Sequence, residues 1–214
     1  MIDQHGGWPD IGDLLRQLPA AWRRAGLLAL AFAEDFAILN ARDGCVPWLA
    51  VALPSSWAPQ DKVGRHFTEV HAAVADNQLL VQASQHLLRL VTGTERWERF
   101  VWTLTAHPRL HAHPQRVDPA RWPPDLPLDE LAALTWFRSE RQTFIPVPDV
   151  EQALFTILVE VQPLAAAIHT PERAARLADA LASMSEAVLA YRGLQHVRAP
   201  LLRWLERRAC ATPA

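Results

Sequence analysis

The stretch TWFRSERQTFIPVP, residues 135–148, decides how the centre of this protein is built. Its two ends are apolar and aromatic, whereas its centre, residues 138–142, is polar at every position. The apolar ends predict a strand in the middle of a sheet. Burying an arginine without a partner is expensive. We therefore expect at least one face of this strand to meet a compensating polar group or an anion.

Side-chain alternation divides the polar centre between the two faces of the strand. One face carries Arg138, Glu140 and Gln142, and the other carries Ser139, Arg141 and Thr143. Pairing of Arg138 or Arg141 with Glu140 or Glu98 inside the protein is one explanation. The other is a planar guanidinium directed at a carboxylate of a ligand. The residues alone leave both explanations open.

The segments on either side of this strand predict an α+β fold. Short apolar or alternating runs predict the strands 36–40, 47–53, 98–106, 135–145 and 152–161. Apolar residues at helical spacing predict the helices 10–30, 59–74 and 78–90, a helical stripe over 170–193, and a last helix near 201–205. The pair Asp43-Gly44 favours a hairpin between the first two strands. Two hairpin strands, a helical crossover and three further strands form the element order of a PAS-like antiparallel sheet.

The length of 214 residues suits one large domain with a helical appendage. We expect an N-terminal helical segment over 1–34, a PAS-like domain over 35–165, and C-terminal helices over 166–214 that pack on it. The stripe from Ala174 to Tyr191 serves either as packing against the sheet, which we favour, or as a dimer interface.

Composition excludes several classes of function. The net charge of -2 and the lack of a basic stripe argue against nucleic-acid or anionic-lipid partners. No phosphate-binding glycine loop and no G-x-S-x-G nucleophile motif occur. The two cysteines lack metal-ligand spacing, no apolar run could span a membrane, and the start resembles no export signal. These features predict a cytoplasmic protein. Lys62 is the only lysine.

Histidines near residue 70 could take part in chemistry. His66, Glu69 and His71 form H-x-x-E-x-H, which is not a zinc motif. On one helix the two imidazoles would lie about 140° apart, so they could not chelate one ion. His71 borders an apolar arc that includes Phe67. It is either a hydrogen-bonded core histidine or an axial ligand of a cofactor that lies against this arc.

A second group of histidines lies in HPRLHAHP, residues 107–114. The prolines at both ends break regular geometry, and no cysteine or acid completes a metal site. We interpret it as a loop with incidental histidines, among which His113 is fixed beside Pro114. Just before it, Arg99, Trp102 and Arg109 are candidates to line one cavity.

Three blocks together resemble the haem-dependent oxidative N-demethylase family. They are LPSSWAPQDKVGRHFTEVHAAVADN (53–77), RWERFVWTLTAHPRLHAHP (96–114) and FRSERQTFIPVPDVEQALFTI (137–157). The resemblance covers about residues 35–165 and implies a PAS-like haem-binding fold. It also implies O₂-dependent removal of methyl groups from small alkylamines, with formaldehyde released. No flavin or iron–sulfur motif is present, so the electrons would come from a separate, NADPH-linked reductase.

Matched residue by residue, His71 becomes the expected metal ligand, holding the iron of haem b. The other expected cofactor-binding residues are Lys62, Arg99, Trp102, Arg138, Arg141 and Gln142. His113 and Glu140 are the expected catalytic residues. His107 departs from the family pattern, in which an acid is common at this position. A homodimer is a further expectation.

Two other functions remain open at this point. A haem- or small-molecule-binding sensor of the PAS-like type would change its absorbance with redox state but form no product. A PAS-like scaffold that has lost its cofactor would take up no haem.

Overall fold

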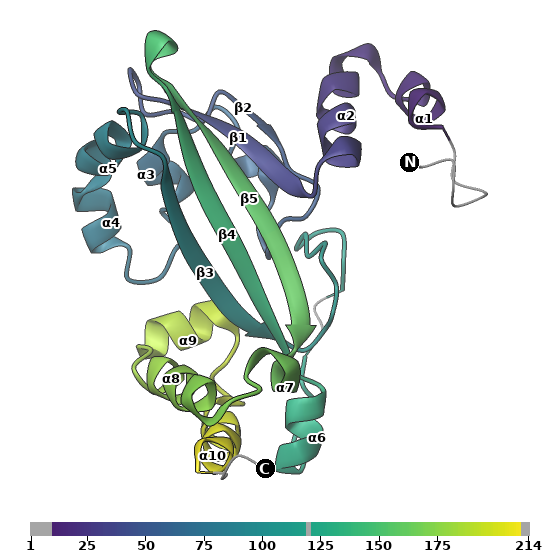
Figure 1. Ribbon diagram of the computed structural model, residues 1–214, viewed down its shortest axis with the longest axis vertical. Helices are drawn as coiled ribbons and strands as arrows, with labels where there is room; N and C mark the ends of the chain where they lie inside the picture. Colours follow the sequence, from purple (N-terminus) through teal and green to yellow (C-terminus); the bar gives the residue numbers. More distant parts are fainter. Residues whose placement is uncertain (1–9, 119–120, 211–214) are drawn as a thin grey trace.

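The computed structural model describes residues 10–118 and 121–210, whose centre is one antiparallel sheet of five strands. The strands are β1 (Glu34–Asn40), β2 (Trp48–Ala50), β3 (Trp97–Thr105), β4 (Trp136–Val147) and β5 (Gln152–Pro163). Their order across the sheet is β2-β1-β5-β4-β3. Helices cover parts of the sheet and gather at one end of it (Figure 1). The α+β fold expected from the sequence is confirmed, and the arrangement is compatible with a PAS-like domain.

Three groups of helices surround the sheet (Figure 1). The first, away from the others, contains α1 (Ile11–Gln17), η2 (Ala20–Trp22) and α2 (Arg23–Ala31). The second follows β2 and contains η3 (Pro59–Asp61), α3 (Phe67–Val70), α4 (Gln78–Gln82) and α5 (Ser84–Val91). The third lies at the far end of the sheet and contains α6 (Leu128–Ala133), α7 (Leu164–Ala167), α8 (Pro171–Ala182), α9 (Glu186–Arg192) and α10 (Arg198–Ala209). The single turn η4 (Pro148–Val150) joins β4 to β5. No helix in the described ranges is long and apolar enough to cross a membrane.

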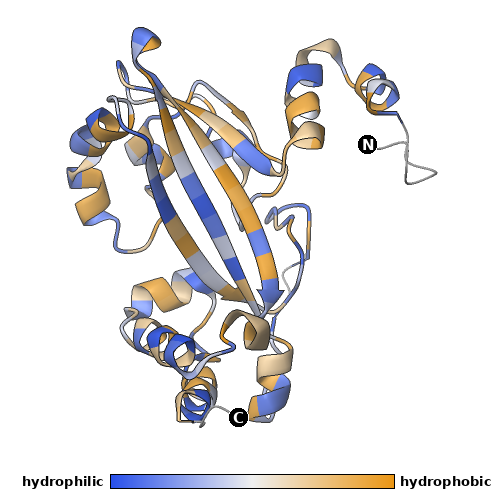
Figure 2. Cartoon of the chain, in the orientation of Figure 1, coloured by the Kyte–Doolittle hydropathy of each residue, from blue (hydrophilic) through white to orange (hydrophobic). Residues whose placement is uncertain are grey.

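The register of β4 confirms the two faces predicted for its polar centre. Arg138 pairs with Thr103 and Val161, and Gln142 pairs with Arg99. We call the face that carries Arg138, Glu140 and Gln142 the inner face, because the loop 52–66 and helices α3–α5 lie against it. The face that carries Ser139, Arg141 and Thr143 is the outer face. Figure 2 shows hydrophilic residues along the middle of β4 beside the largely apolar β5.

The prediction of one long helix over 59–74 is wrong, because local backbone geometry divides this segment. Gly64 has a φ of 77°, a left-handed conformation that ends regular helix. His66 then begins the four-residue helix α3 with a capping box: its ring accepts from the Thr68 N–H, and Glu69 accepts from the His66 N–H. The second expected helix, 78–90, is divided at Ala83 into α4 and α5.

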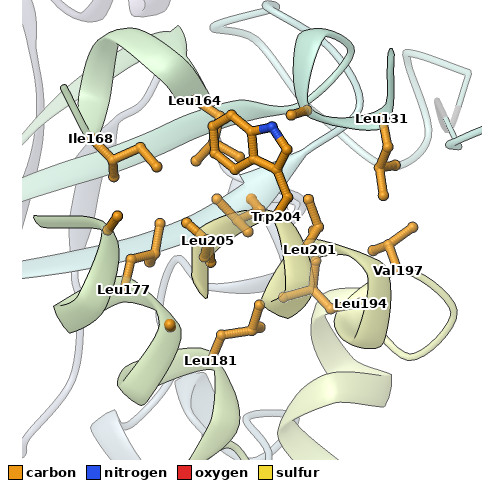
Figure 3. Close-up of a cluster of buried hydrophobic side chains, with 14 of the residues drawn as sticks. Leu131, Leu164, Ile168, Leu177, Leu181, Leu194, Val197, Leu201, Trp204 and Leu205 are labelled. Carbon is orange, nitrogen blue, oxygen red and sulfur yellow. The ribbon is translucent and has the colours of Figure 1, made fainter. Parts of the chain in front are cut away.

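The C-terminal helices form the largest apolar cluster of the described residues (Figure 3). The Thr170 side chain caps α8, and Gly193 ends α9 with a φ of 67°. Leu164, Leu181 and Leu205 are fully buried in the cluster. Each contributes about 1.5–3 kcal/mol to stability. Of the predicted stripe, Ala174, Leu177 and Leu181 are buried in this cluster, whereas Tyr191 at its end is 56% exposed, so only the first part packs inside the chain.

Candidate functional site

His71 lies at the C-terminal end of α3 with one ring nitrogen engaged. Its Nδ1–H donates to the carbonyl oxygen of Phe67 at 2.8 Å, and the two rings are 4.3 Å apart. No hydrogen bond from a described residue uses Nε2, so the lone pair on this atom is available. Burial lowers the pKa of His71, and the nearby cations Arg99 and Lys62 lower it further. The ring is therefore neutral near pH 7, the form in which imidazole binds metal.

An apolar hollow of about 140 Å³ lies between the inner face and helices α4 and α5, and Phe67, whose ring contacts that of His71, is part of its wall. Phe67, Leu88 and Phe144 form apolar wall, and the charged residues of the lining are Glu98 and Arg99. Ligand pockets commonly measure about 300–1,000 Å³. The hollow is therefore smaller than a ligand of that size needs, and helices α4 and α5 form one side of it. Their lengths of 5 and 8 residues make them short helices with little stability of their own.

A row of five hydrogen-bonded side chains runs along the inner face from the hollow. The Arg99 Nε donates to Gln142 Oε1 at 2.7 Å, and Gln142 Nε2 donates to Glu140 Oε2 at 2.6 Å. The Ser55 hydroxyl donates to the other oxygen of Glu140 and accepts from Arg138 Nε at 2.8 Å. The row fixes the Glu140 carboxylate from both sides.

Arg138 ends this row and holds two loops to the sheet. Its terminal nitrogens donate to the carbonyl oxygens of Leu53, Arg109 and Leu110 at 2.8–3.2 Å. With the bond to Ser55, four of its five N–H groups have protein acceptors, and the residue is 2% exposed. Burial lowers the pKa of its guanidinium. Pairing inside the protein therefore accounts for Arg138.

Asp35, which the sequence reasoning missed, supports the same loop from β1. Its carboxylate accepts the N–H groups of Ala52 and Leu53 at 2.7 and 3.0 Å. Burial raises the pKa of Asp35 above its ordinary value, the two N–H groups lower it, and Glu140 raises it again. A signal was present in the sequence, because Asp35 alternates with Ala37 and Leu39 on the inward side of an apolar strand.

The raised pKa of Asp35 predicts a pH dependence of stability. The folded protein holds this proton more tightly than the unfolded chain, so the stabilisation is present below the ordinary value of 3.8 and is lost as pH rises through the folded pKa. We expect Asp35→Asn to remove this decline. Urea unfolding of both proteins from pH 4 to 7 measures it, with Asp149→Asn, at an exposed turn, as the control. Parallel pH profiles for wild type and Asp35→Asn would contradict the assignment.

Arg141 and Trp102 are not brought together with His71, because both lie on the outer face. Arg141 has Glu34 and Glu98 within 3.9–4.0 Å, one of the pairings left open by the sequence. Trp102 stacks on Phe137 at 5.8 Å, and both pack against the C-terminal cluster. The cavity expected to combine Arg99 with Trp102 is therefore not formed.

His113 and Lys62 are both engaged by protein atoms. His113 is 3% exposed; its Nδ1 accepts the Gln115 N–H, so Nε2 carries the proton that is donated to Gln60 at 3.2 Å. No contact among the described residues joins it to His71. The Lys62 ammonium donates to the Val70 carbonyl at 2.6 Å, at the end of the helix that carries His71.

Comparison with known families identifies the class of protein. Residues 23–202 match the family model described as haem-dependent oxidative N-demethylase, alpha subunit-like. The chain belongs to this family. Membership makes haem the cofactor to be tested against the site. In the described part of the chain, no group of three or more His, Cys, Asp or Glu is placed to hold a bare metal ion.

The side chains near the hollow have the chemistry to hold a haem, although the hollow itself is too small for one. In many proteins one histidine imidazole holds the haem iron, and the His71 imidazole has a free Nε2. The bond from Nδ1–H to a backbone carbonyl is the usual support that orients such a ligand. The apolar wall suits a porphyrin plane, and Arg99 suits a carboxylate at its edge.

Proposed function

We propose that this chain is the haem-binding subunit of an oxidative N-demethylase that acts on small secondary or tertiary alkylamines. The observation that supports this most directly is the His71 ring: its Nδ1–H is held by the Phe67 carbonyl, its Nε2 is free, and it contacts the Phe67 ring in the wall of an apolar hollow. When bound, haem b would supply O₂ activation with two electrons from an NADPH-linked reductase. An N-methyl amine, O₂, two electrons and two protons then give the demethylated amine, formaldehyde and water.

We assign separate parts to His71 and to three residues of the inner face, Arg99, Gln142 and Glu140. His71 holds the iron through Nε2, and the Phe67 carbonyl fixes the orientation of the ring. Arg99 neutralises a carboxylate at the edge of the cofactor. Gln142 links Arg99 to Glu140 and keeps the Glu140 carboxylate directed along the inner face.

Glu140 is the residue that we assign to the substrate. A small alkylamine is a cation at neutral pH, and a half-buried carboxylate attracts it. Glu140 can also accept the proton that such an amine must release before its methyl group is oxidised. Lys62, Arg138 and His113 are assigned to positioning, because protein atoms already occupy their hydrogen-bonding groups.

The test is an absorbance spectrum followed by product analysis. We expect protein produced with added haem to show a Soret band and to release formaldehyde from dimethylamine or trimethylamine with O₂ and an electron donor. Glu140→Gln should keep the band but lower kcat/KM about 10²–10⁴-fold. A Soret band without product from any simple methylamine would favour a sensor, and a colourless protein would contradict haem binding altogether.

A further inference from the structure

The N-terminal helices form an arm, residues 10–33, that approaches the rest of the chain mainly where α2 passes β1 and β2. Helices α1 and α2 have 7 and 9 residues, and neither contains a buried residue. Within the described ranges, no hydrogen bond or ion pair joins the arm to residues 34–210. Isolated helices shorter than about 12–15 residues are marginal in water. The arm therefore needs a surface to pack on.

The arm also presents large apolar side chains to solvent. Trp22 is 66% exposed, and Leu27, Leu30 and Phe32 are each about half exposed. Figure 1 shows α1 projecting away from the sheet beyond α2, far from the C-terminal helices. Several large exposed apolar side chains within one short segment indicate an interaction site.

The outer face of the sheet offers a matching surface at the foot of the arm. The C-terminal cluster covers one end of this face through Trp102 and Phe137. At the other end a hollow of about 210 Å³ remains open, lined mainly by Phe32, Phe36, Arg141, Ile145, Leu154 and Leu158. The Phe32 and Phe36 rings meet edge to face at 5.4 Å, so the apolar surface continues from the arm onto the sheet.

The total accessible surface is too large for a compact monomer. The chain of 24.0 kDa exposes 13296 Å². A compact monomer of this mass exposes about 9,900 Å². If the residues outside the described ranges are granted the surface of an unfolded chain, about 2,400 Å², an excess of about 1,000 Å² remains. A stable interface buries about 800 Å² of each partner.

We propose that two copies of this chain associate, each laying its arm across the open part of the partner's outer face. The occupant is a second copy because the same chain carries both uncovered surfaces, the projecting arm and the apolar sheet. Exchange of such surfaces about a two-fold axis covers both at once and closes the assembly. The inner face with His71 lies on the opposite side of the sheet and stays accessible, so the association is independent of the proposed function.

Light scattering coupled to size exclusion tests the association. We expect a mass of twice 24.0 kDa for the full chain. The double variant Leu27→Asp, Leu30→Asp should raise the dissociation constant at least about 100-fold. Leu79→Asp, which is at a highly exposed position in α4, is the matched control and should leave the dimer intact. A monomeric wild type, or a dimer that the arm variant does not weaken, overturns the proposal.

Disulfide trapping places the contact independently of any loss of folding. In a Cys45→Ser, Cys210→Ser background, one preparation carries Leu30→Cys in the arm and the other Leu154→Cys on the outer face. Mild oxidation of the mixture should link the two preparations to each other. A mixture with Leu79→Cys in place of Leu154→Cys should not link. Links that form equally in both mixtures, or in neither, overturn the arrangement.

Discussion

His71→Ala is expected to lose haem binding almost completely, with an affinity loss greater than the 10–100-fold typical of changes to groups that only support a ligand. The reason is that His71, whose ring contacts Phe67 in the wall of the hollow, has an available Nε2 and an oriented Nδ1. The measurement is the Soret absorbance of purified protein during titration with haem. Near-ultraviolet circular dichroism shows whether the variant is folded.

His86→Ala is the matched control, because His86 is exposed on α5 and alanine keeps its helix. It should bind haem as the wild type does. Added imidazole should restore part of the Soret band to folded His71→Ala protein by filling the vacated position. An unchanged spectrum in His71→Ala would exclude His71 as the iron ligand, and the proposed function would then need another donor.

The sequence contained enough information to predict the central strand and its histidine. Strand alternation separated Arg138 from Arg141 correctly, because a strand side chain can point to only two faces. The contact of His71 with Phe67 agrees with the predicted apolar arc, but the long helix on which that arc was drawn is not formed. Gly64 and the His66 capping box break it. Local turn geometry overrode a helical pattern that continued across the break.

Contacts between distant segments could not be predicted. The bonds from Asp35 to Ala52 and Leu53, and from Arg138 to Arg109, depend on how loops cross the inner face. No local pattern records these crossings. Trp102 was misplaced for a related reason: strand period assigns it to a face but does not say which face meets the crossover helices.

Arg138→Met is expected to lower the free energy of unfolding by about 3–5 kcal/mol, the usual cost of removing one partner from a buried charged network. Arg138 is 2% exposed, and its loss leaves the carbonyls of Leu53, Arg109 and Leu110 without their donor. Urea unfolding, followed by the fluorescence of the nine tryptophans, should show a midpoint lower by roughly 2 M. Arg138→Lys should recover less than half of the loss, because an ammonium cannot span the same acceptors.

Arg141→Met is the matched control on the same strand, three residues away on the outer face. Its side chain is about half exposed and approaches Glu34 and Glu98 only at 3.9–4.0 Å. Exposed pairs of this kind contribute about 0–1 kcal/mol, so its midpoint should stay close to that of the wild type. If Arg138 instead served a haem carboxylate, Arg138→Met would keep its midpoint and lose haem affinity. That result would reverse the assignment of Arg138 to positioning and leave the two loops without an anchor in β4.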